Sequence, residues 1–270
     1  MKTKNMTPRL YIDATLATEN AVALSQTQVH YLKNVLRKEE GSEVLVFNGN
    51  EGEFSAKLVE LKKRGGLAAV GPRTRAPEKE PDLTLLFAPV KRGPLEMIIQ
   101  KATELGVSRL APVLTERTVA PKLNIERLQA IAIEAAEQCG RLSVPSVDKP
   151  IKLGALIDAW PQDRRIIFCD EAGDDETKEW GGQDGRAAPI LETLNRTDSK
   201  AQQDVVPGAL LTGPEGGFSP AERAMLRANS FVAPVTLGPR ILRADTAVIA
   251  ALALWQSAVG DWRDGVVTDA

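Results

Sequence analysis

The chain has 270 residues, of which 43% are hydrophobic and 26% charged, and its formal net charge is −2. This composition is typical of a soluble protein of one or two domains with an apolar core, and the near-neutral charge argues against a strongly basic nucleic-acid binder. The first residues form no apolar signal region and no apolar run is long enough to span a bilayer, so we expect a cytoplasmic protein that does not associate with membranes.

The first segment carries an excess of positive charge. Residues 1–77 hold 12 Lys and Arg against 8 Asp and Glu, a net charge of +4, whereas the remainder holds 22 against 28, a net charge of −6. Any phosphate contacts are therefore expected in this first segment.

The same segment is predicted to form a small β-barrel over residues 1–76. A helix is expected at 29–38, and turn residues separate the short apolar runs that follow it. The apolar face of this helix holds Val29, Leu32, Val35 and Leu36. Strands are expected at 43–47, 51–61 and 66–71. A stretch rich in proline and charge comes next, and we expect residues 77–82 to link this domain to a second domain at 83–270.

Strands and helices alternate after the linker, which predicts an α/β domain with a parallel sheet covered by helices on both faces. Strands are expected at 83–90, 109–114 and 165–170, and helices at 94–105 and 125–138. The second of these helices ends at Gly140, so Arg141 could simply neutralise the negative end of the helix.

The cysteines predict no metal site. Cys139 and Cys169 are the only two in the chain, and their spacing is not that of metal ligands. They argue against a disulfide scaffold and against zinc, and they fit a reducing compartment.

The sequence TGPEGGFS, at 212–219, follows a short apolar run and leads into a helix. Glycine allows close approach of a ligand to the backbone, and Pro214 stiffens the turn. Ser219, Pro220 and Glu222 have the pattern of a helix start with a capping box. The loop therefore suits a ligand at the carboxyl edge of the sheet, although a plain strand-to-helix turn would have the same glycines.

A second loop, LGPRILRADT at 237–246, leads into a helix that is apolar nearly all round. Such a helix lies in the core or against another subunit. Two readings of the loop remain open. In one, Arg243 pairs with a structural carboxylate and Asp245 is an ordinary N-cap. In the other, Arg243 holds an electron-rich substrate.

These two loops, together with IIQKATELGV at 98–107 and EAAEQCGR at 134–141, resemble the bacterial RsmE family. That family comprises the 16S rRNA uracil-1498 N3-methyltransferases of the SPOUT superfamily. The resemblance covers residues 9 to about 255. It implies a SPOUT-type parallel sheet with a deep trefoil knot, a PUA-like RNA-binding barrel, S-adenosylmethionine (SAM) as cofactor, a homodimer, and the small ribosomal subunit as partner. The chain departs from the family at Asp245, where Glu is common, and in a longer polar stretch at 170–204.

The resemblance also implies roles for individual residues. The cofactor site would lie mainly within 208–246, at Thr212, Gly213, Pro214, Glu215, Gly216, Gly217, Leu237, Gly238, Pro239, Ile241 and Leu242. RNA contacts would come from Arg9, His30, Arg37, Gln138, Arg141 and Arg240. For His30, a purely structural role is the alternative.

Methylation at N3 of uracil requires loss of a weakly acidic ring proton. Arg243 stays protonated in a protein, so its expected role is to stabilise the developing anion, with Asp245 or Glu215 as proton acceptor. The target uridine would have to be unstacked. Other possible functions are a non-catalytic ribosome assembly factor and a SPOUT methyltransferase of another rRNA or tRNA nucleotide. A nucleotide-dependent enzyme is disfavoured because neither phosphate-binding glycine motif occurs.

Overall fold

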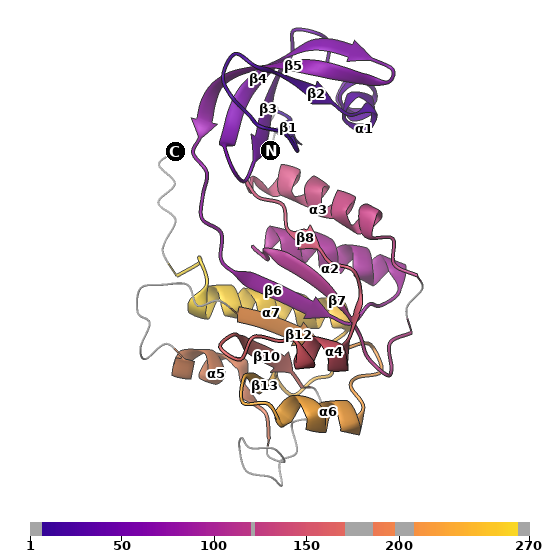
Figure 1. The fold of residues 1–270 in the computed structure, drawn as a ribbon, viewed down its shortest axis with the longest axis vertical. Coiled ribbons are helices and arrows are strands. Elements are labelled where there is room, and N and C mark those ends of the chain that lie inside the picture. Colours follow the sequence, from indigo (N-terminus) through magenta and orange to yellow (C-terminus); the bar gives the residue numbers. More distant parts are fainter. Residues whose placement is uncertain (1–6, 120–121, 171–185, 198–207, 264–270) are drawn as a thin grey trace. The chain divides into compact units, whose positions relative to one another are not determined.

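The chain forms two compact units, shown as a ribbon in the computed structural model of Figure 1. The structure describes residues 7–119, 122–170, 186–197 and 208–263. The first unit contains Met1–Lys79 together with Ile133–Val144, and the second contains Glu80–Ala132 together with Pro145–Ala270. Besides residues 1–79, the first unit thus contains a segment of the chain that lies more than fifty residues further on.

The first unit is built on a curled five-stranded sheet with the order β1-β3-β4-β5-β2. Its strands are β1 (Arg9–Tyr11), β2 (Ala21–Leu24), β3 (Glu43–Asn48), β4 (Gly52–Lys62) and β5 (Gly65–Arg75). Strand β1 pairs with β3 in parallel, whereas the other pairs are antiparallel. The core contains apolar side chains from every strand, among them Leu10, Val22, Val46, Leu58 and Val70. The predicted strands are all present.

The predicted helix of this unit begins earlier and changes its winding. Helix α1 (Gln26–His30) starts at a capping box between Ser25 and Gln28 and continues as a π-helical turn, η1 (Tyr31–Val35). Because π-helical hydrogen bonds run from i to i+5, the turn rotates the apolar face. Val35, predicted on that face, is 60% exposed, whereas Leu36 packs against the core.

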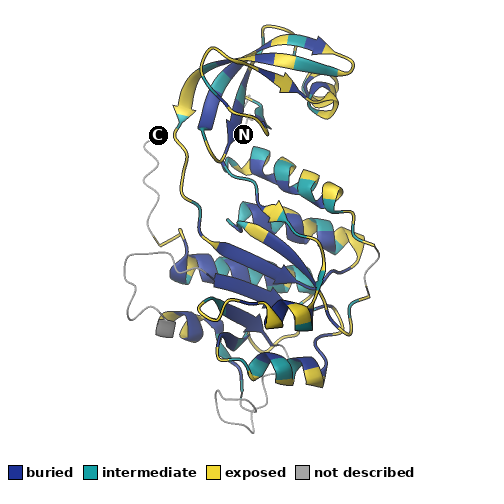
Figure 2. Ribbon diagram, viewed as in Figure 1, coloured by how far each residue is buried: buried dark blue, intermediate teal, exposed yellow. Residues whose placement is uncertain are grey.

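The second unit contains a parallel sheet with the order β11-β13-β10-β12-β6-β7-β8. Its strands are β6 (Leu83–Phe87), β7 (Arg109–Leu114), β8 (Ser146–Val147), β10 (Arg165–Cys169), β11 (Ala188–Pro189), β12 (Gly208–Thr212) and β13 (Val232–Thr236), with β9 (Ile151–Lys152) on the end of β7. Every residue of the neighbouring strands β6 and β12 is buried, as Figure 2 shows in dark blue. Continuous apolar runs are expected for strands that helices cover on both faces.

In the described part of the second unit, the helices are α2 (Arg92–Glu104), α4 (Leu153–Asp158), α5 (Ile190–Thr197), α6 (Pro220–Arg227), α7 (Ala244–Val259) and the first part of α3 (Ile125–Cys139), whose later residues belong to the first unit. Helix α7 packs against α2, α5 and β12. On the other face, side chains of α4 and α6 join one apolar cluster with Leu86, Phe168 and Leu211 of the strands. The predicted two-sided covering of the sheet is confirmed.

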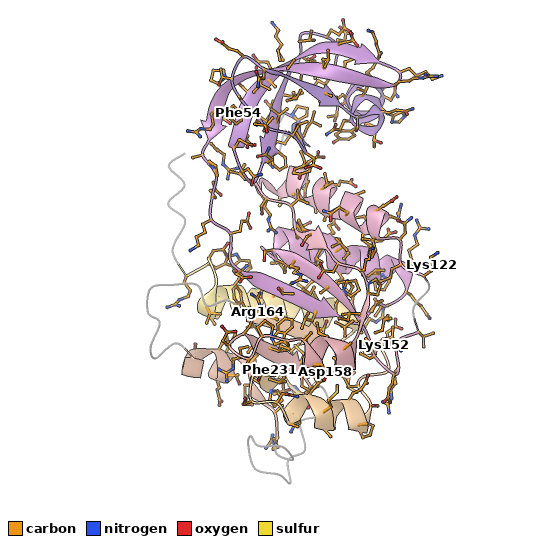
Figure 3. All side chains as sticks on the ribbon, in the orientation of Figure 1. Phe54, Lys122, Lys152, Asp158, Arg164 and Phe231 are labelled. Carbon is orange, nitrogen blue, oxygen red and sulfur yellow. The ribbon has the colours of Figure 1, made fainter. Side chains whose placement is uncertain are left out.

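Arg164 ties together the starts of the central strands (labelled in Figure 3). Its guanidinium donates to both carboxylate oxygens of Asp82, at 2.6 and 2.8 Å, to Thr84 Oγ1 at 3.0 Å and to Gly208 O at 3.1 Å. The hydrogen bonds from Arg164 lower the pKa of Asp82. This edge of the sheet is thus occupied by structural contacts, and the opposite edge is the one left for a ligand.

Candidate active site at the carboxyl edge of the sheet

A cavity of about 430 Å³ lies where β10, β12 and β13 end and α7 begins. Parallel α/β sheets bind ligands at this edge, and the volume is within the range of small-molecule sites. The two glycine-containing loops meet here with the end of β10, which lies well before them in the sequence. The lining includes Thr212, Gly213, Pro214, Glu215, Gly217, Leu237, Gly238, Pro239, Ile241 and Leu242. These are all the predicted cofactor residues except Gly216.

We call the first loop, residues 212–219, the glycine loop. Its backbone is held in a tight turn. Gly217 has φ of +65° and its N–H donates to Pro214 O at 2.9 Å. A Cβ on Gly213 would lie 2.6 Å from Cε2 of Phe218, whose ring packs edge-on against Phe168. Glycine is required at both positions, by conformation at Gly217 and by close packing at Gly213.

The helix that follows starts as the sequence predicts. Ser219 is the N-cap of α6, its hydroxyl accepts from Glu222 N, and the Glu222 carboxylate accepts from Ser219 N. Pro220 occupies the first helical position. The capping box therefore fixes the point at which the glycine loop ends.

Gly216 lies outside the residues that line the cavity, unlike its neighbours. Its carbonyl accepts a hydrogen bond of 2.9 Å from Arg117 Nη1. A Cβ at this position would lie 3.6 Å from Arg117 Cβ, an ordinary contact. The predicted cofactor contact of Gly216 is therefore not supported, because the loop turns this residue toward Arg117.

The second loop enters α7 two residues earlier than the interpretation of Asp245 as N-cap requires. Arg243 is the N-cap, and Asp245 lies in the first helical turn, where its Oδ1 accepts from Thr246 N at 2.8 Å. Asp245 is not among the lining residues. The interpretation of Asp245 as N-cap was wrong, and its predicted catalytic role loses support from the geometry.

Two arginines of this loop border the cavity. Arg240 and Arg243 both line it and are both exposed. Neither guanidinium forms an ion pair with another side chain in the described part of the chain, which leaves the pairing of Arg243 with a structural carboxylate without support. Glu215, also exposed, contributes a carboxylate to the same cavity. The site thus combines two available cations with one candidate proton acceptor.

Six lining residues were not predicted. Two of them, Cys169 and Asp170, lie at the end of β10, and the others are Val235, Thr236, Ala244 and Ala247. Asp170 is 1% exposed and accepts from Arg223 Nε at 2.8 Å, Arg223 Nη2 at 3.1 Å and Arg227 Nε at 2.9 Å. These bonds attach α6 to the wall of the cavity. The position of Asp170, directly after a buried strand, is one at which α/β proteins bind ligands. No sequence motif marks this position, so the residue was not predicted.

The predicted RNA-binding residues other than Arg240 belong to the first unit. His30, Arg37 and Gln138 are exposed there. Arg141 is half-buried, and its Nε donates to Ser143 Oγ at 3.1 Å. Arg9 differs from them, because its side chain is only 8% exposed and its Nε lies 2.7 Å from Glu53 Oε2. The prediction that Arg9 faces RNA is therefore not supported, since a buried guanidinium that is already paired with a carboxylate is not available to a phosphate.

In the described part of the chain, no helix has both the length and the apolar character needed to cross a membrane. The described residues also contain no cluster of His, Cys, Asp and Glu that could hold a metal ion. The predicted polar stretch at 170–204 falls largely on residues 171–185 and 198–204, outside the described part.

Comparison with known proteins matches two parts of the chain to RNA methyltransferase families. Residues 77–256 match the RNA methyltransferase domain family, and residues 24–70 match the RNA methyltransferase PUA domain. The fold and the cavity therefore define a two-domain protein of the RNA methyltransferase class.

The relatives identify the family within this class. The chain is 30% identical over 246 residues to ribosomal RNA small subunit methyltransferase E of Rickettsia conorii, covering 91% of this chain and 93% of the relative. It is 34% identical over 252 residues to the protein of that name from Synechocystis, with 92% and 77% covered. The chain belongs to the ribosomal RNA small subunit methyltransferase E family.

Two solved structures of bacterial methyltransferases are similar over nearly the whole chain. One, from Legionella pneumophila, was solved with SAM bound; it is 28% identical with a TM-score of 0.74, covering 94% of this chain and 98% of the other. The other is a ribosomal RNA small subunit methyltransferase E of Neisseria gonorrhoeae, also bound to SAM; it is 28% identical with a TM-score of 0.71, covering 93% and 98%.

Proposed function

We propose that this protein transfers a methyl group from SAM to N3 of a uridine, U1498, in the 16S rRNA of the small ribosomal subunit. The observation that carries the proposal is the cavity in which the glycine loop meets the loop of Arg240 and Arg243. The solved relatives from Legionella and Neisseria bind SAM, and the curated relatives carry the name of small-subunit rRNA methyltransferases.

The residues of the cavity fit an adenosyl ligand. Backbone from Gly213, Gly217 and Gly238 lines the wall, and Gly238 has φ of +108° with no atom within 4 Å of its absent Cβ. Such a wall offers amides and carbonyls to an adenine edge and to ribose hydroxyls at close range. Leu237, Ile241 and Leu242 add apolar surface. SAM supplies the reactive methyl group when bound, and the chain supplies position and electrostatics.

The charged residues have complementary roles in this proposal. The Arg243 guanidinium remains protonated and donates hydrogen bonds to the uracil oxygen on which negative charge develops. Glu215, which lines the cavity, is the proton acceptor that the geometry favours over Asp245. Arg240 at the rim of the cavity binds RNA phosphate. In the first unit, the residues that contact RNA are Arg37, His30, Gln138 and Arg141.

Three finer features belong to the same proposal. The loops around the cavity form the deep trefoil knot of the SPOUT superfamily. The protein acts as a homodimer, which is supported by the half-buried apolar residues Ile249, Ala250, Ala253 and Leu254 of α7. It works in the cytoplasm, where its ribosomal substrate is found.

The test is methyl transfer from labelled SAM to small subunits purified from a strain that lacks the protein, with mass mapping of the modified nucleotide. Label at N3 of U1498 is expected. Label on another nucleotide would keep the enzyme class and change the target. Binding of subunits without label, together with no thermal shift by SAM or S-adenosylhomocysteine, would indicate a non-catalytic assembly factor. A thermal shift by ATP alone would contradict the cofactor.

A further inference from the structure

The carboxylate of Glu222 connects the glycine loop to a second loop at the end of β7, and this connection exceeds what helix capping requires. Its Oε2 accepts from Ser219 N at 2.9 Å, within the capping box, and its Oε1 accepts from Glu116 N at 2.8 Å. Glu222 is 7% exposed. Glutamine would cap the helix equally well, but only a carboxylate offers acceptors to both N–H groups at once. The buried charge is therefore needed for the connection between the loops.

A second contact connects the same two loops, again with its donor in the loop after β7. Arg117 donates from Nη1 to Gly216 O at 2.9 Å. Thus Gly216 is held by Arg117 and Ser219 is held through Glu222. Between them lies Gly217, which lines the cavity in a left-handed conformation.

The loop that provides these contacts, residues 115–118, is itself closed by hydrogen bonds. Thr115 N donates to Thr118 Oγ1 at 3.0 Å, the two threonine hydroxyls are 2.8 Å apart, and Thr118 N donates to Thr115 O at 3.1 Å. Thr115 is 9% exposed. The glycine loop is thus attached to a segment that has little freedom to move.

We propose that Glu222, assisted by Arg117, is a positioning residue that holds the glycine loop in its ligand-binding shape before the cofactor arrives. This inference rests on the proposed function and assigns roles to two side chains that do not line the cavity. A loop that is already ordered loses less conformational freedom on binding, so its affinity is higher. Loss of the connection raises the Kd for SAM, whereas kcat at saturating SAM depends on Arg243 and Glu215 and stays nearly constant.

The test compares the wild type, three single variants and the double variant of Glu222 and Arg117 by calorimetry with SAM and by steady-state methyl transfer. In Glu222→Gln, the amide group faces one of the two N–H donors, so the connection to Glu116 or Ser219 is lost. Arg117→Ala removes the second contact from the surface without disturbing the core. Ser219→Ala is the matched control, because it removes the hydroxyl bond to Glu222 N, at 3.2 Å, and leaves both contacts with residues 115–118 in place.

We expect Glu222→Gln to raise the Kd and KM for SAM about tenfold and Arg117→Ala about threefold, with kcat and the KM for RNA within about twofold of wild type. The double variant should show less than the sum of the two effects, because the contacts act on one loop. Ser219→Ala should lower the unfolding temperature without changing the Kd.

Equal Kd values in wild type, Glu222→Gln and Arg117→Ala would overturn the inference, as would a Ser219→Ala variant that loses affinity in proportion to its loss of stability. If Glu222→Gln does not fold, the Kd of Arg117→Ala alone decides the test. Arg117 is exposed, so its replacement leaves the core unchanged. Failure of the wild-type protein to bind SAM would instead overturn the proposed function itself.

Discussion

Arg9 and Glu53 form a buried ion pair, with 2.7 Å between Nε and Oε2 and less than a tenth of either side chain exposed. The other donors of Arg9 reach Ala136 O, Glu137 O and Arg141 O at 3.0 to 3.1 Å. A strand of the curled sheet is thereby joined to the carbonyls at the end of α3, where a cation is favourable. This arrangement explains why residues 133–144 belong to the first unit.

Replacement of Arg9 by Ala should destabilise the first unit by about 3–5 kcal/mol, because Glu53 is left buried without its partner. Hydrogen exchange of peptides from β1, β3 and α3 measures the loss. Tryptophan fluorescence should change little, since no Trp occurs in the two stretches that make up the first unit, residues 1–79 and 133–144. The control is Arg37→Gln, on an exposed residue, which should weaken RNA binding and leave exchange unchanged. Unaltered exchange in Arg9→Ala would contradict the structural role.

Glu137 should make the stability of the same unit depend on pH. Burial raises the pKa of Glu137 to about 7, against the lowering effect of the hydrogen bond from Tyr11 N. The folded state therefore keeps a proton that the unfolded state releases, and stability falls as pH rises from about 4.5 to about 7.

Glu137→Gln keeps an oxygen for Tyr11 N and removes the ionisation. At pH 8 it should stabilise the first unit by about 1–3 kcal/mol, and near pH 4.5 it should have almost no effect. Denaturant titrations followed by hydrogen exchange at both pH values measure this difference. A gain of equal size at both pH values would show that ionisation is not its cause.

The two glycines on either side of Glu215 should differ in their tolerance of alanine. In Gly213→Ala, the new Cβ displaces the Phe218 ring, which should cost about 1–3 kcal/mol and weaken SAM binding. Gly216→Ala meets only an ordinary contact outside the cavity and serves as the control. Calorimetry and thermal melts separate the two. Weaker SAM binding in Gly216→Ala would show that Gly216 belongs to the cofactor site.

Arg243→Ala should reduce kcat by about 10²- to 10³-fold, as the loss of one donor to a developing anion does in other enzymes, while the Kd for SAM changes little. Arg240→Ala, the neighbouring exposed cation, should mainly raise the KM for RNA. Methyl transfer rates and calorimetry give both quantities. A large loss of SAM affinity in Arg243→Ala would assign this arginine to cofactor binding.

Local patterns predicted the parts of the fold that depend on neighbours in sequence. The apolar runs at 83–90 and 109–114 contain the strands Leu83–Phe87 and Arg109–Leu114, and the capping pattern at Ser219 and Glu222 is present as expected. The prediction for Val35 failed because π-helical winding depends on packing, which a 3.6-residue period does not report. Asp245 failed as an N-cap because the helix begins two residues earlier, a difference that composition does not encode.

By itself the sequence determined the alternation of strands and helices, the two glycine-containing loops and their placement after buried strands, because each follows from periodicity and turn chemistry over a few residues. Only the tertiary structure decided which side chains became partners. The bonds of Glu222 to Glu116, of Asp170 to Arg223 and of Arg9 to Glu53 each span more than forty residues. Their formation depends on how strands are ordered in the sheet and on the cost of burying a charge alone, and neither quantity can be read from local spacing.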